Sequence, residues 1–527
     1  MPTEPTLVET AEAAEPAEAA EPQAGGKRRV ILNTIYMGGA QVVSLLVSFI
    51  AFPLFLKHYG TSIYGLFLLV SAVVSTLAVF DFGVTSIITK ETAHHLALGD
   101  QGALSRTTVA AFEFYALLSV VGAAVLVWIG ANTHTLFRVT QVQAELLRLM
   151  FFVQAGVQLL TFVTAPARQV LAGFQRYGTL ALCNVLSVIG STLAIVVVLV
   201  SGRGPLVLVT LSGLASVVVA LAFLLALFRA VPWRSLSFKS IPRPEVRKLL
   251  RLGFPLFLIQ ITSFLVMQQS DKLVLGVFLS AAALSLYEMP SKLFSLASQA
   301  LNTSVGTILP YISGLTARGQ HKRVQNTFVY GSRYLSLLLC PALALLFIGA
   351  PTFITLWVGS QYAAVGTVAR LLLAIPMFWP VMSIGDSVLV SMDKMSKWTP
   401  YAMASGLIGL GLSLLLVRPW GLVGVALASF VAALCEFASF IWVVLRIARI
   451  DVRSWLFSAV APGLCAIALS CGLFLLVSWA LKISSLWVLI ALCVGILVIV
   501  WLIIGVVFTD QAERKMILHW VSRPKEN

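Results

Sequence analysis

A polar stripe inside an apolar stretch carries the clearest chemistry in this sequence. Its members are spaced by three or four residues, so on a helix they share one face, and they are Glu288, Lys292, Ser295, Gln299, Asn302 and Gly306. At about 1.5 Å per residue the stripe is about 27 Å long, close to the ~30 Å thickness of a bilayer's hydrocarbon core. Such a face suits the wall of a water-filled cavity. The alternative is a helix that packs on its neighbours through small and polar residues.

Two charge pairs accompany this stripe. Glu288 and Lys292, at i and i+4, can neutralise each other. Asp271 and Lys272 follow Gln268 in the preceding apolar stretch. A charged side chain at the bilayer centre costs about 2.5–3.5 kcal/mol on insertion scales, so charges kept there predict a binding role. Nearer the interface, Lys272 would instead extend its ammonium group into the headgroups.

Five further charged residues lie in apolar stretches. Arg333 and Arg370 can bind an anion. Asp81, Asp386 and Glu436 are candidates for coupling to a proton or Na⁺. Asp81, in the segment FDFGVTSIITKETA, could equally cap or brace the polar residues that follow it.

Apolar helices must position these groups. The chain has 527 residues, of which 59% are hydrophobic and only 11% charged, which predicts an all-α polytopic membrane protein. The alternating ten-residue pattern of a membrane barrel is absent. We expect about fourteen transmembrane helices, and their ranges are 31–56, 62–89, 107–130, 146–167, 179–201, 206–228, 252–279, 283–312, 326–348, 364–390, 398–417, 422–445, 455–481 and 484–508.

The charge distribution predicts the orientation. The net charge of +15 comes mostly from Lys and Arg in alternate connections between the expected helices. That asymmetry is the positive-inside rule and places both termini in the cytoplasm. Because the basic residues follow the membrane pattern, nucleic-acid binding is disfavoured.

A basic segment from Arg229 to Arg251 divides the chain. It carries seven cations, one acid and three prolines, and the prolines forbid a continuous helix. We expect residues 1–26 to form a disordered acidic tail, 27–228 a first lobe of six helices, 229–251 a cytoplasmic linker, 252–445 a second six-helix lobe, 446–508 two further helices and 509–527 a cytoplasmic tail.

The two lobes resemble each other. Tyr64 and Tyr287 lie 223 residues apart, Gly99 and Gly319 lie 220 apart, and similar polar turns begin at Phe174 and Met392, 218 apart. Near-equal offsets predict an internal repeat, although apolar helices with basic turns can look alike by chance. Because each repeat has an even number of crossings, the lobes should be parallel pseudo-repeats.

Enzyme signatures are missing. There is no G-x-x-x-x-G-K-[ST], H-E-x-x-H or G-x-S-x-G motif, so we assign no catalytic residue. The six cysteines are scattered without metal-ligand spacing, and we expect no metal or bound cofactor. The connections on the expected outer side are short, which argues against a glycan polymerase, ligase or glycosyltransferase.

Three segments carry a family resemblance, and they are FDFGVTSIITKETAHHLALGD, GFQRYGTLALCNVLSVIGS and QQSDKLVLGVFLSAAALSLYEMPSKLFSLASQALNTSVGTILPYIS. They resemble the polysaccharide or O-antigen flippases (Wzx-type) of the multidrug/oligosaccharidyl-lipid/polysaccharide (MOP) exporter superfamily, over residues 28–508. That resemblance implies a V-shaped, MATE-like pair of lobes in a bacterial cytoplasmic (inner) membrane. It implies translocation of undecaprenyl-diphosphate-linked oligosaccharide for lipopolysaccharide O-antigen, capsule or exopolysaccharide biosynthesis. Membrane lipids, a polysaccharide polymerase and glycosyltransferases are the partners that it implies.

The implied substrate gives the charged residues roles. Lys292, Lys272, Arg333 and Arg370 could bind the diphosphate, and the stripe could line the space for the glycan. Lys292 would be central, released from Glu288 when the diphosphate enters.

Two other transport functions stay open. The first is a cation-coupled, MATE-like exporter of small amphipathic molecules, for which Asp81, Asp386 and Glu436 could serve. The second is a lipid II flippase. It is disfavoured because the early helices of such flippases carry arginines, whereas residues 31–56 hold no acidic or basic residue. A purely structural scaffold is disfavoured by the charges within the membrane.

Overall fold

The computed structural model describes residues 24–230, 243–266, 269–305, 308–481 and 483–507, with side chains described from Leu46 onward except beside the gaps. Within these ranges every regular element is a helix and none is a strand. The expected all-α fold is therefore confirmed.

The helices fall into two sets on either side of the basic segment. The first set is α1 (Ala24–Val79), α2 (Val84–Leu98), α3 (Gln101–Ala131), α4 (Thr133–Leu136), α5 (Gln141–Gly173), α6 (Tyr177–Ser201) and α7 (Pro205–Ala230). The second set is α8 (Arg243–Val266), α9 (Gln269–Phe278), α10 (Ala281–Val305), α11 (Ile308–Ala317), α12 (His321–Trp357), α13 (Val365–Ala374), α14 (Trp379–Ser391), α15 (Thr399–Ala448), α16 (Val452–Trp455), α17 (Ala461–Ala480) and α18 (Leu486–Val507).

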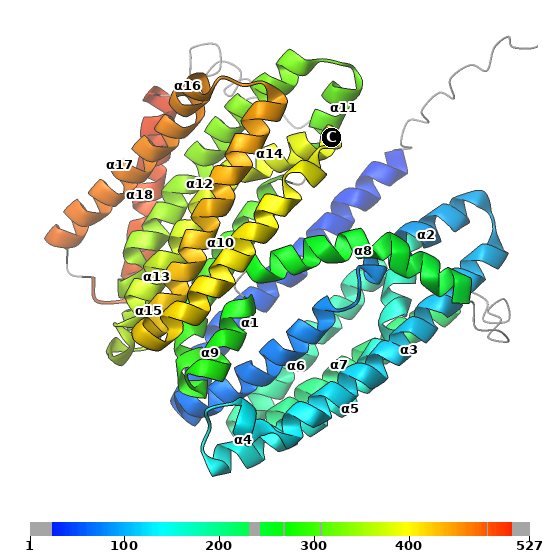
Figure 1. The fold of residues 1–527 in the computed structure, drawn as a ribbon. Helices are drawn as coiled ribbons and strands as arrows, with labels where there is room; N and C mark the ends of the chain where they lie inside the picture. The colour runs from blue at the N-terminus through cyan, green and yellow to red at the C-terminus, as the bar shows by residue number, and fades with distance from the viewer. Residues whose placement is uncertain (1–23, 231–242, 267–268, 306–307, 482, 508–527) are drawn as a thin grey trace, which may run out of the picture.

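Two of the longest helices contain a chain reversal at a glycine. Gly60 in α1 has φ 75° and ψ 171°, and Gly421 in α15 has φ 56° and ψ −131°. Positive φ is accessible to glycine at little steric cost. Figure 1 shows both helices as a pair of arms joined at the lower end of the molecule.

The helices match the expected crossings. Ten described segments are long and apolar enough to span a membrane, and two of these, 46–79 and 399–448, contain the reversals just described. The paired helices α8–α9 and α10–α11 account for the described residues of the expected ranges 252–279 and 283–312, apart from residue 279. A turn at residues 80–83 interrupts the expected range 62–89.

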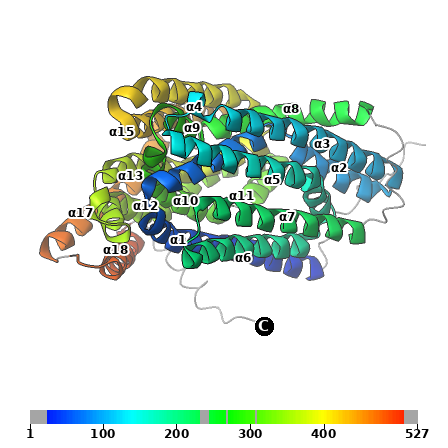
Figure 2. The ribbon, with the colours of Figure 1, turned by 90° about the horizontal axis from the view of Figure 1, so that it is seen from below.

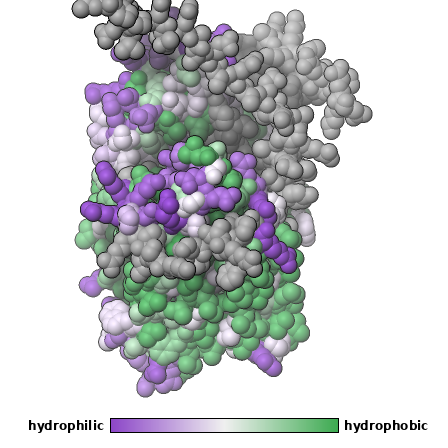
Figure 3. All heavy atoms as spheres, turned by 90° about the vertical axis from the view of Figure 1, so that its right-hand side faces the viewer, coloured by the Kyte–Doolittle hydropathy of each residue, from purple (hydrophilic) through white to green (hydrophobic). Residues whose placement is uncertain are grey.

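Apolar residues cover a large part of one face of the molecule. In the space-filling view, apolar residues cover most of the lower part, and hydrophilic residues gather above them and at the lower edge (Figure 3). Trp479 and Trp487, at the α17–α18 connection, are 88% and 80% exposed. Exposed tryptophans of this kind are typical of a membrane interface. The chain is a multi-pass membrane protein.

The helices form two bundles. Helices α1–α7 make the first bundle, and α9–α15 make the second, with α17 and α18 packed on α12 (Figure 1). Seen from below, α17 and α18 lie at one edge, far from α2 and α3 (Figure 2). Helix α8 crosses from the first bundle to the second and contacts α2, α3 and α15.

The bundles meet where the chain reverses. We call the end that carries Gly60 and Gly421 the reversal end, and the opposite end, where α7 stops and α8 begins, the linker end. At the reversal end the Ser285 hydroxyl donates a hydrogen bond to the Thr61 carbonyl at 2.6 Å. A Cβ placed on Gly65 would lie 1.7 Å from the Ala281 carbonyl oxygen, so the two backbones touch directly.

Repeated turns relate the two bundles. Gly99 and Gly319 have φ of 69° and 66°, and each amide donates to the carbonyl three residues earlier. Gln175 and Asp393, 218 residues apart, have φ of 55° and 54° and also donate three residues back. These matching turns support the parallel pseudo-repeat inferred from the sequence.

The expected linker is only partly a linker. Helix α7 continues to Ala230 and α8 begins at Arg243, so residues 243–251, expected to precede the seventh helix, are its first turns. Residues 231–242, most of the expected tail 1–26, and the expected tail 509–527 lie outside the described residues.

Helix α8 is fastened to the first bundle at the linker end. The Lys248 ammonium contacts the Glu91 carboxylate, and Arg106 Nε lies 3.3 Å from Glu245 Oε1. Beyond these ion pairs, a Cβ on Gly83 would lie 2.3 Å from the Gly253 carbonyl oxygen. The start of α8 thus belongs, by its contacts, to the first bundle.

Candidate functional site

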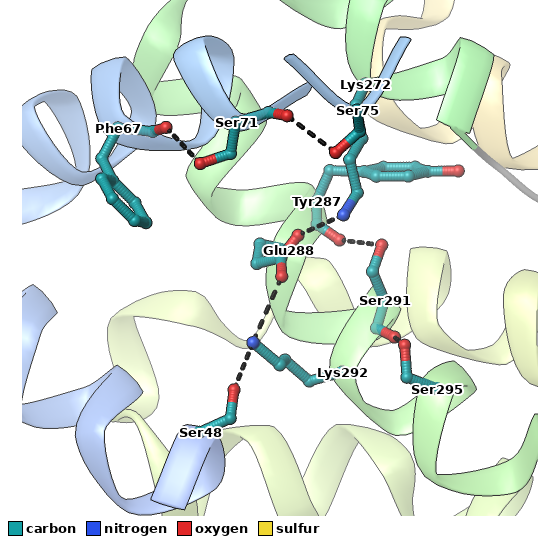
Figure 4. A network of polar contacts seen from close by, with 10 residues as sticks. All are labelled: Ser48, Phe67, Ser71, Ser75, Lys272, Tyr287, Glu288, Ser291, Lys292 and Ser295. Atoms are coloured by element: carbon teal, nitrogen blue, oxygen red, sulfur yellow. Dashed lines mark hydrogen bonds and ion pairs between the residues drawn. The ribbon is translucent and has the colours of Figure 1, made fainter. Parts of the chain in front are cut away.

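Two lysines share one carboxylate where the bundles meet. Lys272 Nζ lies 2.9 Å from Glu288 Oε2, and Lys292 Nζ lies 3.4 Å from Glu288 Oε1 (Figure 4). The Glu288 side chain is 8% exposed, whereas those of Lys272 and Lys292 are 20% and 19% exposed. With all three ionised, the triad carries one net positive charge.

The turn between α9 and α10 places Lys272 beside Glu288. Lys272 precedes Ser280 by eight residues and Glu288 follows it by eight, so on the antiparallel helices α9 and α10 they lie at the same depth. At about 1.5 Å per residue this depth is roughly 12 Å from the reversal end. The sequence placed Glu288 beside Lys292, and the partnership with Lys272 follows from the turn between α9 and α10.

Lys292 also reaches the first bundle. Its ammonium donates a hydrogen bond to the Ser48 hydroxyl on α1 (Figure 4). Ser48 precedes Gly60 by twelve residues, and Lys292 follows Ser280 by twelve, which again gives equal depth. Lys292 therefore bridges the bundles.

Asp271 lies apart from its neighbour Lys272. Its carboxylate is 3% exposed, and it accepts hydrogen bonds from the Tyr287 hydroxyl at 2.6 Å and the Ser429 hydroxyl at 2.5 Å. These contacts tie α9 to α10 and α15. The adjacent residues thus have separate partners, Asp271 within the second bundle and Lys272 at the triad.

The rest of the predicted polar stripe is only partly described. Ser295 donates its hydroxyl hydrogen to the Ser291 carbonyl at 2.8 Å, and Gln299 is half-buried. Gln268 and the side chain of Asn302 lie outside the described residues.

Two arginines, Arg333 and Arg370, were predicted to bind an anion. Arg370 is exposed on α13. Arg333 on α12 is half-buried, with its guanidinium carbon 5.9 Å from the centre of the Tyr334 ring. Neither lines the two cavities described below.

Asp81 braces a turn. It is 6% exposed, and its Oδ1 accepts a hydrogen bond from the Gly83 amide at 2.9 Å. Its Oδ2 accepts hydrogen bonds from the hydroxyls of Thr85 and Tyr115, the latter at 3.3 Å. Both oxygens are occupied in holding α2 against α3, which is the capping role that the sequence left open.

The other two predicted coupling residues are Asp386 on α14 and Glu436 on α15, and these two helices contact each other. Glu436 is 8% exposed and lies within range of the Asp386 charge. Asp386 Oδ1 is buried and accepts no hydrogen bond from the described residues. Neither residue takes part in the ion pairs of the triad. No group of three or more metal-ligating side chains occurs among the described residues.

Two adjoining cavities open in the first bundle. One, of about 300 Å³, lies between α1, α6 and α7 and has Lys292 in its wall; the other, of about 240 Å³, lies between α1, α5 and α7. They share Phe67 and Ser212. Their polar lining residues are Ser48, Tyr64, Ser71, Ser75, Gln154, Ser191, Thr192, Ser212, Ser216 and Lys292.

Sequence reasoning missed this lining. The signal was present as serines four residues apart in apolar helices, Ser71 with Ser75 and Ser212 with Ser216. Serine in a membrane helix commonly bonds its own backbone, however, so the pattern alone does not indicate a cavity.

A wider cleft of about 720 Å³ opens at the reversal end. It lies between the segment around α4 and the end of α9, and its basic lining residues are His134, Arg138 and Arg418. Arg418 stacks over Phe278 at 5.8 Å. No carboxylate lines it among the described residues.

Comparison with known proteins now identifies the family. A family model described as "Polysaccharide biosynthesis protein" matches residues 30–316, more than half of the chain. The chain belongs to this family. No curated protein sequence matches it.

Solved transporters share its fold. A structure of the lipid II flippase MurJ in an inward closed conformation is 15% identical, has a TM-score of 0.68, and the match covers 92% of this chain and 100% of that one. An inward-facing multidrug resistance MATE family transporter of the MOP superfamily is 14% identical, with a TM-score of 0.58 and coverage of 80% and 94%. A MOP superfamily transporter from Pyrococcus furiosus is 15% identical, with a TM-score of 0.53 and coverage of 81% and 95%.

These matches confirm the resemblance drawn from the sequence. The fold of this polysaccharide biosynthesis protein is the two-lobed fold of the MOP superfamily. The family model assigns the chain to polysaccharide biosynthesis, and the solved flippase and transporters share its fold.

Proposed function

We propose that the protein is a flippase for undecaprenyl-diphosphate-linked oligosaccharide units, acting in the bacterial cytoplasmic membrane by alternating access. The observation that carries the proposal is the triad of Lys272, Glu288 and Lys292 at the seam between the bundles, beside a hydroxyl-lined cavity. Phosphate oxygens and lysine ammonium groups form strong charge-assisted hydrogen bonds. Membership of the polysaccharide biosynthesis family supports the glycan part of the substrate.

Orientation follows from the basic residues. The linker end carries Lys248, Arg247 and Arg251, and alternate connections at the same end carry most of the other cations. By the positive-inside rule this end is cytoplasmic and both termini are inside. The reversal end, where the bundles touch at Gly65 and Ala281, then faces the outer leaflet, so substrate enters from the cytoplasmic side.

The triad explains how binding could be reversible. In the absence of substrate, Glu288 partly neutralises both lysines. An arriving diphosphate competes with Glu288 for Lys292, whose ammonium already contacts Ser48 of the first bundle. When the bundles part at this seam, Lys292 loses that contact, and Glu288 can displace the diphosphate toward the outer side.

Replacement of Lys292 tests the proposal. Lys292→Gln should slow flipping of a fluorescent polyprenyl-diphosphate oligosaccharide in proteoliposomes at least about tenfold, because a hydrogen bond to a charged group contributes roughly 1.5–3 kcal/mol. Lys292→Arg should keep part of the activity. Arg370→Gln, which removes an exposed cation outside the cavities, is the matched control. Unchanged flipping by stably inserted Lys292→Gln protein would refute the proposed role.

A second function has its own observation. Asp386 and Glu436, on the contacting helices α14 and α15, could exchange a proton or Na⁺, as a cation-coupled exporter of small amphipathic molecules requires. The same pair could instead couple glycolipid flipping to an ion gradient. Asp386→Asn should abolish gradient dependence in either case, and a drug-resistance assay in an expressing strain separates the substrates. Lipid II stays disfavoured as the substrate, because residues 31–56 hold no acidic or basic residue. The match to a lipid II flippase is one of fold and does not indicate a shared substrate.

A further inference from the structure

We infer that the paired cavities of the first bundle are a binding site for the sugar part of the substrate, and that this site favours uncharged, hydroxyl-bearing sugars over acidic ones. The inference rests on the proposed function, because Lys292 at the cavity wall is taken to hold the diphosphate. It places glycan recognition in the first bundle, on α1, α5, α6 and α7, and phosphate recognition at the seam.

Five of the eight hydroxyl side chains that line the cavities donate their hydrogen to a backbone carbonyl. Ser71 donates to the Phe67 carbonyl at 2.9 Å, and Ser75 donates to the Ser71 carbonyl at 2.8 Å (Figure 4). On the other walls, Thr192 donates to Val188 at 2.6 Å. Each is a bond back to the carbonyl one helical turn earlier.

The same pattern continues at two more positions. Ser191 donates to the Val188 carbonyl at 3.0 Å, and Ser216 donates to the Ser212 carbonyl at 3.0 Å. A serine or threonine hydroxyl has one hydrogen and two lone pairs. Once the hydrogen is used, what remains toward the cavity is an acceptor.

An acceptor-lined cavity selects a ligand that donates. Sugar hydroxyl groups are donors and can bond to these oxygens. A carboxylate has acceptors only, so where it faces a wall hydroxyl whose hydrogen is committed, both that hydroxyl oxygen and the carboxylate oxygens lack a donor. Leaving a buried polar group unpaired costs about 1–3 kcal/mol, and more for a charged one.

The charge of the lining supports the same selection. Among the described lining residues, Lys292 is the one charged side chain, and it is engaged with Glu288 and Ser48. A uronate further inside would find no cation of its own. Gln154 supplies a side-chain amide donor, and Phe52, Phe55 and Phe67 supply apolar walls for the carbon faces of the rings.

A substitution at Ser212 can test the proposed sugar site. It lies in the wall of both cavities, so a larger side chain there would reduce the volume of both. It is half-buried, whereas Val218 on the same helix is 65% exposed and lines neither cavity. Ser212→Leu is therefore a filling variant, and Val218→Leu is its matched control.

Binding of three short-chain probes distinguishes the possibilities. The probes are citronellyl diphosphate, the same lipid bearing a neutral disaccharide, and the same glycolipid with one sugar hydroxymethyl group oxidised to a carboxylate. Calorimetry on the purified full-length protein in nanodiscs should give about tenfold tighter binding of the neutral glycolipid than of either other probe. Ser212→Leu should remove that advantage and leave citronellyl diphosphate binding unchanged. Val218→Leu should behave as wild type.

Other results overturn the inference. Equal or tighter binding of the acidic glycolipid, or an advantage of the neutral one that survives Ser212→Leu, refutes it while the proposed function stands. Loss of citronellyl diphosphate binding in Ser212→Leu would mean that the cavity binds the lipid diphosphate and not the sugar. Failure of all three probes to bind would refute both the inference and the proposed function. Ser71→Val, on the opposite wall, repeats the test if Ser212→Leu does not fold.

Discussion

Glu288 is the residue on which the charge balance of the seam depends. One carboxylate, 8% exposed, faces two ammonium groups that retain about a fifth of their surface. Removing one charged member of this cluster by substitution is costly, because the charges that remain lose their partner. Because two ammonium groups face one carboxylate, the site keeps a net positive charge that can attract an anion.

Glu288→Gln should separate affinity from turnover. Without the carboxylate, two lysines repel each other, and we expect the protein to lose roughly 1–3 kcal/mol of stability, less than for a fully buried pair because both lysines are partly solvated. Citronellyl diphosphate should bind more tightly, since nothing competes for Lys292, and flipping should slow because release is impaired. Thermal melts, calorimetry and flipping rates measure the three effects.

The double variant Glu288→Gln/Lys272→Gln is the control. It returns the triad to one positive charge, so stability should recover while the competing carboxylate stays absent. If neither variant binds the diphosphate more tightly than wild type does, Glu288 acts as a structural group and does not compete with the ligand.

At the residue scale, the sequence located polar positions better than it assigned their partners. The spacing of Glu288 and Lys292 predicted their contact, because i and i+4 face each other on any helix. Lys272, Ser48 and the cavity hydroxyls joined the site through turns between helices and packing between bundles, which spacing does not encode. Asp81, a predicted coupling residue, has both oxygens occupied by the turn that it braces.

Among the elements, the contacts of α1 with α10 and α12 close the reversal end. Gly65 and Ala281 touch backbone to backbone, and the Trp357 indole donates to the Phe49 carbonyl at 3.1 Å. Neither contact can survive separation of the bundles. The seal should therefore be the part of the structure that opens when substrate leaves toward the reversal end.

Gly65→Val should hold that seal open. Its Cβ would lie 1.7 Å from the Ala281 carbonyl oxygen, and since backbone atoms stand on both sides, the helices must move apart. In a background without native cysteines, disulfide formation between cysteines at Thr61 and Ser285 should fall severalfold. Gly156→Val, with nothing within 4 Å of the added Cβ, is the control. Equal cross-linking in both variants would contradict this account of the seal.

Glu91 makes the fastening of α8 dependent on pH. Burial alone would raise the pKa of Glu91, but the hydrogen bond and charge of Lys248, with the charges of the neighbouring histidines, hold that pKa below its ordinary value. A carboxylate whose pKa is lowered by folding stabilises the protein above its unfolded-state pKa of about 4.3. That contribution is lost as pH falls through the lower folded-state value.

Lys248→Gln should remove this stabilisation. We expect a loss of about 0.5–1 kcal/mol at pH 7.5, modest because the Lys248 side chain is half exposed. The difference from wild type should disappear at a pH low enough to protonate Glu91 in the folded protein. Arg247→Gln removes the same charge from an exposed neighbour and should change stability little at either pH. Thermal melts at the two pH values measure the effect, and equal losses in both variants would exclude the ion pair as its cause.

Helix boundaries show where sequence patterns succeed at the element scale. Apolar length located the expected crossings because each must cover ~30 Å of hydrocarbon. The start of α8 was placed too late, at 252, because its charged first turns resemble a loop until Glu91 and Arg106 are known to lie beside them. The course of α8 across both bundles has no counterpart in hydropathy.

At the scale of the whole molecule, α8 is joined to the first bundle both by the peptide chain and by direct contacts. The covalent connection between bundles passes through residues 231–242, yet α8 is also held to the first bundle by Lys248, Glu245 and the contact at Gly83. Association through these groups does not require the peptide chain. It needs only that the two fragments meet in one membrane.

A protein split within residues 231–242 and expressed as two fragments should therefore copurify and keep part of its flipping activity. Adding Lys248→Gln and Arg106→Gln should weaken copurification far more in the split protein than it lowers activity in the intact chain, where the tether keeps the effective concentration of the second bundle high. Pull-down of one tagged fragment and flipping in proteoliposomes measure both. Complete loss of flipping by fragments that still copurify would mean that the segment does more than connect, and that its cations take part in moving the bundles.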